Sequence, residues 1–209
     1  MMIKGIVFDL DGTLIDTAKI LAESWEKAFI SENIHVNYEE IYKNTKGISS
    51  KDIVKKYKKD SNPNDVLRIK EKRKENFIKL LDKNKILYPE TISVLERLKL
   101  KGIKTAIGTG MSNDLLKRVL DITSLKDFVN AVVSSDDVKN GKPSPDIFIE
   151  AFKRINVEPN LGMVVGDSLN DVDPGKKIGA FTVFISREGE KLDYADANII
   201  NLEEVFKFI

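Results

Sequence analysis

Four groups of polar residues each follow an apolar run, and their side chains are of the types that bind phosphate and divalent cations. In chain order they are Asp9-Leu10-Asp11-Gly12-Thr13, Gly108-Thr109-Gly110, Ser134 to Asp137 with Lys142, and Gly166-Asp167-Ser168 with Asp171 one helical turn on. Clustered carboxylates repel one another and so imply a cation, and oxygen ligands without histidine or cysteine suit magnesium. A lysine and a threonine beside such a cation would bind the oxygens of a phosphoryl group. The spacing therefore predicts a magnesium-dependent phosphoryl-transfer site.

The apolar runs before these groups are predicted to be strands of one sheet. They are residues 3–8, Thr105–Ile107, Ala131–Val133 and Met163–Val165, followed by a fifth run at Phe181–Ile185. Amphipathic segments of helical length lie between them at 90–100, 112–120, 145–154 and 168–178. This alternation favours an α/β fold, a doubly wound, Rossmann-like parallel sheet with right-handed crossovers. Ligands of open parallel sheets bind outside the carboxyl ends of the strands, so we expect the four polar groups to meet there.

Residues 16–87 differ in composition from the rest of the chain. They contain one glycine, Gly47, and one proline, Pro63, and their apolar residues recur at helical spacing. We expect an all-helical insertion, so that residues 1–15 and 88–209 form the sheet domain. Residues 51–85 hold 13 Lys or Arg against 6 Asp or Glu. A solvated helix surface explains this excess, and steering of an anionic substrate is the alternative.

The overall composition excludes several classes of protein. The 209 residues carry a formal net charge of +1 and no cysteine, which excludes disulfides, thiolate zinc sites and cysteine nucleophiles. With His35 as the single histidine, a Ser-His-Asp hydrolase is disfavoured, and we expect His35 at the surface. The balanced charge gives no indication of nucleic acid or membrane partners, and no apolar run approaches the length of a membrane span. We expect a soluble, cytoplasmic protein whose partner is a small phosphorylated metabolite; the oligomeric state is left open.

The four motifs, in this order, resemble those of the haloacid dehalogenase-like hydrolase superfamily. The resemblance is carried by Asp9-Leu10-Asp11-Gly12-Thr13-Leu14, Thr109, Lys142-Pro143 and Gly166-Asp167-Ser168-x-x-Asp171. It extends over essentially the whole chain and is closest to the phosphoglycolate-phosphatase-like branch, in which a helical cap follows the first motif. It implies that residues 16–87 are such a cap, which closes over the substrate, excludes water and contributes selectivity.

The resemblance also implies a role for each residue. Asp9 would be the nucleophile that becomes an aspartyl phosphate, and Asp11 the general acid and base. Thr109, Gly110 and Lys142 would hold the phosphoryl oxygens, with Gly110 acting through its backbone N–H. Magnesium would be bound by Asp9, by Asp167 and by Asp11 through its backbone carbonyl. Asp171 would orient the lysine and a metal-bound water.

The residues themselves support some of these roles and leave alternatives to others. Gly12 permits the positive φ that a turn between Asp11 and the following chain requires. Thr109 could instead cap a helix, and Asp171 could simply favour the first turn of one. Ser144 and Asp146 are interpreted as helix-start residues rather than ligands.

These residues predict a magnesium-dependent phosphatase of small phosphomonoesters, with phosphoglycolate ahead of nucleoside monophosphates and sugar phosphates. A β-phosphoglucomutase-like mutase and a phospho-accepting signalling module are the alternatives. The segment Gly47–Lys51 resembles the mutase branch only in part, with Ser50 where arginine is expected, and the histidine expected early in the cap is absent. The chain also departs from the common pattern at Gly110, where serine or asparagine is frequent, and at Glu90, where glycine is frequent.

Overall fold

The computed structural model describes residues 3–44, 48–81 and 86–209 of the chain. Gly47, the first residue of the loop singled out above, lies outside the described residues. Within the described part, no helix is both long and apolar enough to cross a membrane.

The chain divides into two compact units. The first combines Met1–Asp16 with Leu87–Ile209, and the second is Thr17–Ile86. The second unit is therefore a continuous insertion between the first and second strands of the sheet. The boundaries expected from composition, after residues 15 and 87, each lie one residue from this division.

The first unit is built on a six-stranded sheet in the order β3-β2-β1-β4-β5-β6, in which every neighbouring pair is parallel. Its strands are β1 (Gly5–Phe8), β2 (Lys104–Gly108), β3 (Ala131–Val133), β4 (Gly162–Gly166), β5 (Phe181–Ile185) and β6 (Ala197–Ile199). This order is that of a doubly wound Rossmann-like sheet, which confirms the predicted fold class. The edge strand β6 was not predicted, because this three-residue strand has an exposed Asn198 at its centre and so contains no continuous apolar run.

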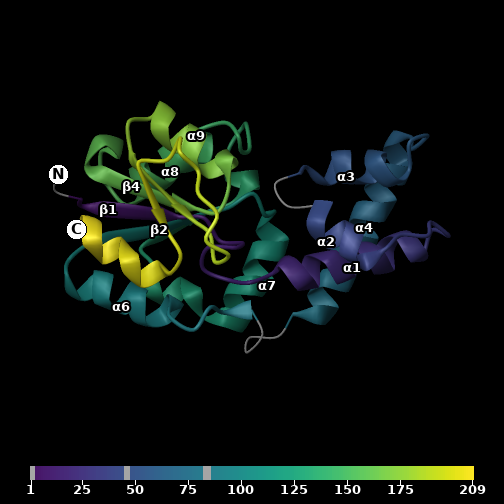
Figure 1. Ribbon diagram of the computed structural model, residues 1–209, viewed down its shortest axis with the longest axis horizontal. Coiled ribbons are helices and arrows are strands. Elements are labelled where there is room, and N and C mark those ends of the chain that lie inside the picture. Colours follow the sequence, from purple (N-terminus) through teal and green to yellow (C-terminus); the bar gives the residue numbers. More distant parts are fainter. Residues whose placement is uncertain (1–2, 45–47, 82–85) are drawn as a thin grey trace. The chain divides into compact units, whose positions relative to one another are not determined.

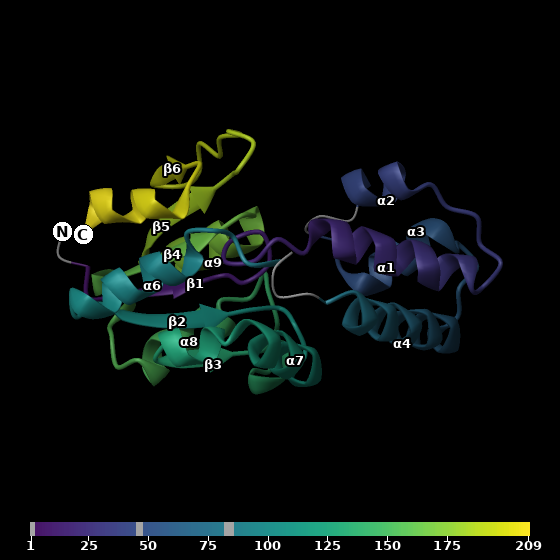
Figure 2. The same ribbon diagram turned by 90° about the horizontal axis from the view of Figure 1, so that it is seen from below.

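Helices cover both faces of this sheet (Figure 1). They are α6 (Thr91–Leu100), α7 (Asn113–Thr123), α8 (Asp146–Arg154) and α9 (Leu169–Lys177), with 3₁₀ turns η1 (Leu125–Phe128), η2 (Ser135–Asp137), η3 (Pro159–Leu161) and η4 (Leu202–Phe208). The α8 helix packs Phe148 and Phe152 against Val7, Ala106 and Val164 of the central strands. Figure 1 shows α6 on the opposite face of the sheet from α8, and Figure 2 shows the strands spread side by side. The chain runs outward from β1 through β2 to β3 and then returns to the other side of β1 with β4. The strand order thus reverses between β1 and β4, which is where ligands of such sheets bind.

The second unit is all-helical, as the sequence pattern indicated. It contains α1 (Ala18–Ile30), α2 (Tyr38–Asn44), α3 (Ser50–Tyr57) and α4 (Pro63–Leu80). Its core includes Trp25, Phe29 and Ile69, so the helical spacing of apolar residues in α1 and α4 identified buried positions. His35 is exposed, as predicted.

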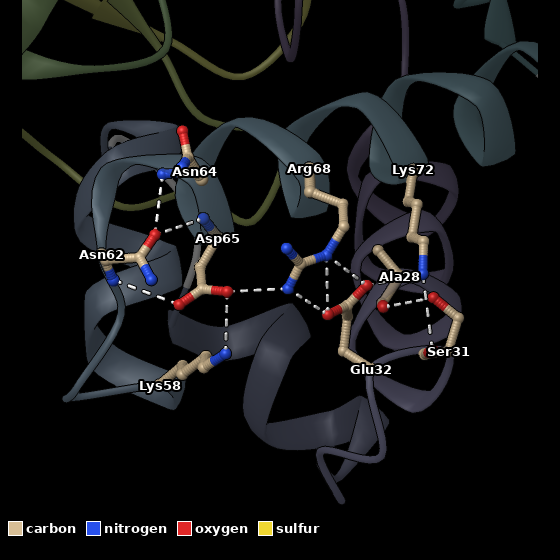
Figure 3. Close-up of polar contacts among 9 residues, drawn as sticks. All are labelled: Ala28, Ser31, Glu32, Lys58, Asn62, Asn64, Asp65, Arg68 and Lys72. Atoms are coloured by element: carbon tan, nitrogen blue, oxygen red, sulfur yellow. Dashed lines mark hydrogen bonds and ion pairs between the residues drawn. The ribbon is translucent and has the colours of Figure 1, made fainter.

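A network of ion pairs ties α4 to the segment after α1. Arg68 lies between two carboxylates, those of Glu32 and Asp65 (Figure 3). Its guanidinium donates to both carboxylate oxygens of Glu32 at 2.7–3.0 Å and to Asp65 at 2.7 Å. Lys72 donates to Glu32 at 2.5 Å, and Lys58 lies 3.1 Å from Asp65.

We expect this network to make the stability of the second unit fall in acid. Hydrogen bonds from Arg68 and then Lys72 lower the pKa of Glu32 from 4.5 to about 2. A pKa lowered by folding adds stability above the unfolded value, and this stability is lost as the pH falls from 4.5 towards about 2. We therefore expect the Tm to fall through this range in the wild type and to fall less steeply in Glu32→Gln. Circular dichroism melts across the pH series measure this, with the exposed Glu39→Gln as the matched control; parallel slopes in all three proteins would contradict it.

Candidate active site

The first strand delivers Asp9 to the carboxyl edge of the sheet. The Asp9 N–H donates to the Val165 carbonyl at 2.8 Å, so this residue continues the pairing of β1 with β4. The chain then turns sharply, and the Gly12 N–H donates to the Ile15 carbonyl at 2.7 Å. Asp11 sits inside this turn and is half-buried.

Gly12 is required in this turn for two separate reasons. Its φ is +79°, in the left-handed region that glycine adopts without strain. A Cβ at this position would also lie 2.2 Å from Oδ2 of Asp167, far inside van der Waals contact. The absence of a side chain therefore lets the first motif lie directly against the residue that follows β4.

Lys142 joins two of the carboxylates. Its Nζ donates to Oδ1 of Asp9 at 2.5 Å and to Oδ1 of Asp171 at 2.7 Å. Asp171, in the first turn of α9, is 2% exposed, and Ser168 donates to its other oxygen at 2.6 Å. Below the lysine, the Phe148 ring lies 4.9 Å from Nζ. These contacts hold the ammonium group in one position at the end of β1 and β4.

Three carboxylates form a group that could hold a metal ion. One oxygen from each of Asp9, Asp167 and Asp171 lies within 4.8 Å of the others. The carboxylate of Asp11 is not a member of this group, whereas Asp171, expected only to orient other groups, is. All the donors are hard oxygen atoms, which fits a divalent cation such as magnesium or calcium.

The electrostatics of the site also call for a cation. Burial raises the pKa of Asp9 well above its ordinary value, and nearby carboxylates add to this rise although the Lys142 ammonium opposes it. Those carboxylates belong to Asp171, Asp167 and Asp11. Burial lowers the pKa of Lys142, but the carboxylates of Asp171 and Asp9 outweigh burial and raise it above its ordinary value. The Lys142 ammonium thus pairs with two of these four carboxyl groups, Asp9 and Asp171, and a bound cation would favour the ionised forms of all four.

The second strand places Thr109 at the same edge of the sheet. Its N–H donates to the Val133 carbonyl at 2.9 Å, and its side chain is 1% exposed. The hydroxyl oxygen accepts from the Met111 N–H at 3.1 Å and is free to donate its own proton elsewhere. Gly110 is exposed, and a Cβ there would meet no atom within 4 Å.

The acidic residues after the third strand serve local structure instead. Asp136 accepts from the Asn113 N–H at the start of α7 at 2.7 Å. Asp137 accepts from the Ser134 N–H at 2.7 Å and pairs with Arg154 of α8. Ser144 donates to Asp146 at 2.6 Å where α8 begins, in accord with the interpretation of both as helix-start residues.

Two contributors to the site were given no role from the sequence, although Ser168 is part of the fourth motif. The Ser168 hydroxyl orients Asp171, and the Ser-x-x-Asp spacing of a helix start was a signal for this contact. Phe148 supports Lys142, but nothing local in the sequence distinguishes it from the other core residues of α8.

Comparison with known proteins agrees with this geometry. Residues 3–179 match the family model of the haloacid dehalogenase-like hydrolases. A phosphoglycolate phosphatase from Aquifex aeolicus is 32% identical over 183 residues, covering 86% of this chain and 83% of that protein. A phosphorylated carbohydrates phosphatase from Thermotoga maritima is 29% identical, covering 87% and 84%. The crystal structure of a hydrolase from Pseudomonas syringae superimposes with a TM-score of 0.81 at 25% identity, covering 98% of this chain and 97% of that one. The chain therefore belongs to the haloacid dehalogenase-like hydrolases.

Proposed function

We propose that this protein is a magnesium-dependent phosphatase that hydrolyses small phosphomonoesters through an aspartyl phosphate on Asp9. The observation that carries the proposal is the position of Lys142 between Asp9 and Asp171, beside Asp167. This arrangement supports the proposal, because a carboxylate suited to be a nucleophile, a cation suited to bind phosphate and carboxylates suited to bind a metal lie close together where the strand order reverses.

In the first half-reaction, one carboxylate oxygen of Asp9 attacks phosphorus. The bond between phosphorus and the ester oxygen breaks, and Asp11 donates a proton to that leaving oxygen. Lys142 and Thr109 hold the phosphoryl oxygens during transfer, since an ammonium and a hydroxyl both donate to them. The alcohol leaves, and the phosphoryl group stays on Asp9.

In the second half-reaction, water attacks the phosphorus of the aspartyl phosphate. Asp11, now ionised, accepts a proton from this water, the bond from phosphorus to Asp9 breaks, and inorganic phosphate leaves. Asp9 and Asp167, with the Asp11 backbone carbonyl, would hold the metal, and Asp171 would orient Lys142. When bound there, magnesium supplies charge neutralisation and polarises the phosphoryl oxygens.

The names of the relatives support the substrate class but differ within it. One relative is a phosphoglycolate phosphatase and another a phosphorylated carbohydrates phosphatase, so small phosphorylated metabolites are common to both. We propose phosphoglycolate as the first substrate to test.

A panel of phosphorylated metabolites, assayed for inorganic phosphate with magnesium present, tests the proposed function. Many equivalents of phosphate per protein molecule would support a phosphatase. Release of no more than one equivalent would instead indicate a phospho-accepting module, and conversion of a sugar phosphate to its isomer would indicate a mutase.

The role of Asp11 predicts a dependence on the leaving group. An alkoxide needs a proton to leave, whereas p-nitrophenolate hardly does, and general acid–base catalysis contributes about 10²–10⁴-fold. Asp11→Asn is therefore expected to slow phospho-enzyme formation by at least about 10²-fold with an alkyl phosphate and much less with p-nitrophenyl phosphate. Because dephosphorylation also needs the base, a burst of p-nitrophenol followed by a slow steady state is expected in stopped-flow assays. Equal losses of the first step with both esters would contradict this role.

A further inference from the structure

Arg187, just after β5, contacts both chain segments that border the insertion. Its Nη2 donates to the Thr13 carbonyl, in the first motif, at 3.1 Å. Its Nη1 donates to Glu90, and its guanidinium lies 3.9 Å from the centre of the Tyr88 ring. The side chain is 21% exposed, so most of this cation is withdrawn from water. None of the four motifs contains Arg187.

The turn that carries Asp11 is held by hydrogen bonds within it and by hydrogen bonds from residues outside it. Within the turn, the Leu10 carbonyl accepts from the N–H groups of Leu14 at 3.0 Å and Ile15 at 3.1 Å. Two later carbonyls of the turn instead accept hydrogen bonds from side chains far away in the sequence. The Leu14 carbonyl accepts from the Thr91 hydroxyl at 2.7 Å, and the Thr13 carbonyl accepts from Arg187. Arg187 therefore anchors the residue two positions after Asp11.

Glu90 keeps Arg187 in this orientation. Burial raises the pKa of Glu90, but the hydrogen bond and charge of Arg187, together with hydrogen bonds from backbone N–H groups, outweigh burial and lower it, so the carboxylate is charged at neutral pH. The same carboxylate accepts from the Leu202 N–H at 3.3 Å, which ties it to the start of η4. Glu90 has a φ of −87°, so its backbone does not require the glycine that is frequent at this position. A glutamate at this position thus provides the carboxylate that pairs with Arg187.

We propose that Arg187 is a positioning residue for Asp11, acting through the Thr13 carbonyl and aligned by Glu90. The inference rests on the proposed function, because it assumes that Asp11 protonates the leaving group. A catalytic group displaced by about 1 Å can lose on the order of 10²-fold in rate, so one anchor of the turn is expected to have a measurable effect. Its effect should appear in the chemical step that uses Asp11 rather than in substrate binding.

The test compares Arg187→Met with Arg97→Met. Arg97 is a matched control, because it also pairs with a glutamate, Glu203, and lies 4.0 Å from the centre of an aromatic ring, Phe206, but it contacts none of the four motifs. We expect Arg187→Met to slow phospho-enzyme formation about tenfold with an alkyl phosphate and less than about twofold with p-nitrophenyl phosphate, with the substrate Kd unchanged. Arg97→Met should leave the rate of phospho-enzyme formation unchanged with both esters. Equal losses in the rate of phospho-enzyme formation with both esters in Arg187→Met would overturn the proposal.

A double-mutant cycle separates positioning of Asp11 from general loosening of the fold. If Arg187 acts through Asp11, adding Arg187→Met to Asp11→Asn should cost no further rate with the alkyl phosphate. Additive losses would overturn the proposal. Should Arg187→Met fail to fold, Glu90→Gln, which retains an acceptor oxygen, takes its place. Glu90→Gln should show the same leaving-group dependence with a smaller loss of rate. Failure of the proposed function is separately visible, since the wild type would then release no phosphate.

Discussion

Asp9→Asn is expected to abolish turnover while leaving the fold intact. The amide has nearly the volume of the carboxylate but is a poor nucleophile and a weaker metal ligand, so the rate should fall by at least about 10³-fold. We expect the Tm to be retained, because Lys142 keeps its ion pair with Asp171 and the repulsion among the carboxylates decreases. Rapid quench followed by intact-protein mass spectrometry should find no phospho-enzyme with either alkyl or aryl phosphates.

Asp136→Asn is the matched control for this variant. Asp136 also follows a strand of the sheet, but it is exposed and its side chain accepts from the Asn113 N–H at the start of α7, away from the acidic group. Its replacement should leave kcat within about twofold of the wild type. If Asp9→Asn gave a burst of p-nitrophenol while Asp11→Asn formed no phospho-enzyme from either ester, the roles of the two aspartates would be reversed.

Removal of divalent cations is the second change expected to have a large effect. Without a cation, burial and the neighbouring carboxylates disfavour the ionised form of Asp9, which is the form that would attack phosphorus in the proposed mechanism. We expect EDTA followed by desalting to reduce turnover to background and excess magnesium to restore it. Magnesium should also raise the Tm in the absence of substrate, since a ligand that binds only the folded state stabilises it.

Asp167→Asn provides the control that links this effect to the acidic group. It removes one charged oxygen ligand but neither the nucleophile nor the lysine, so at least about tenfold more magnesium should be needed for half of the Tm shift. Full activity of the thoroughly demetallated wild type would refute the proposed role of the metal. An unchanged magnesium requirement in Asp167→Asn would place the ion elsewhere.

The sequence alone was sufficient to predict most of the fold. Apolar runs bounded by polar groups predicted five of the six strands, because a strand buried on both faces needs apolar side chains at nearly every position. The helical insertion was predictable from apolar residues recurring at threes and fours. The edge strand β6 was not predicted, since a three-residue strand with an exposed polar centre has no detectable periodicity.

The sequence also determined which groups are available for chemistry, through the residues that follow the strands. Which of them meet was decided by tertiary structure alone. Asp136 and Asp171 have the same kind of sequence context, yet the first accepts a hydrogen bond at the start of α7 and the second binds Lys142. The difference lies in strand order: β1 and β4 are neighbours, whereas β3 lies at the edge of the sheet. Contacts such as Arg187 with Thr13, between residues far apart in the chain, likewise depend on long-range packing, which local periodicity does not encode.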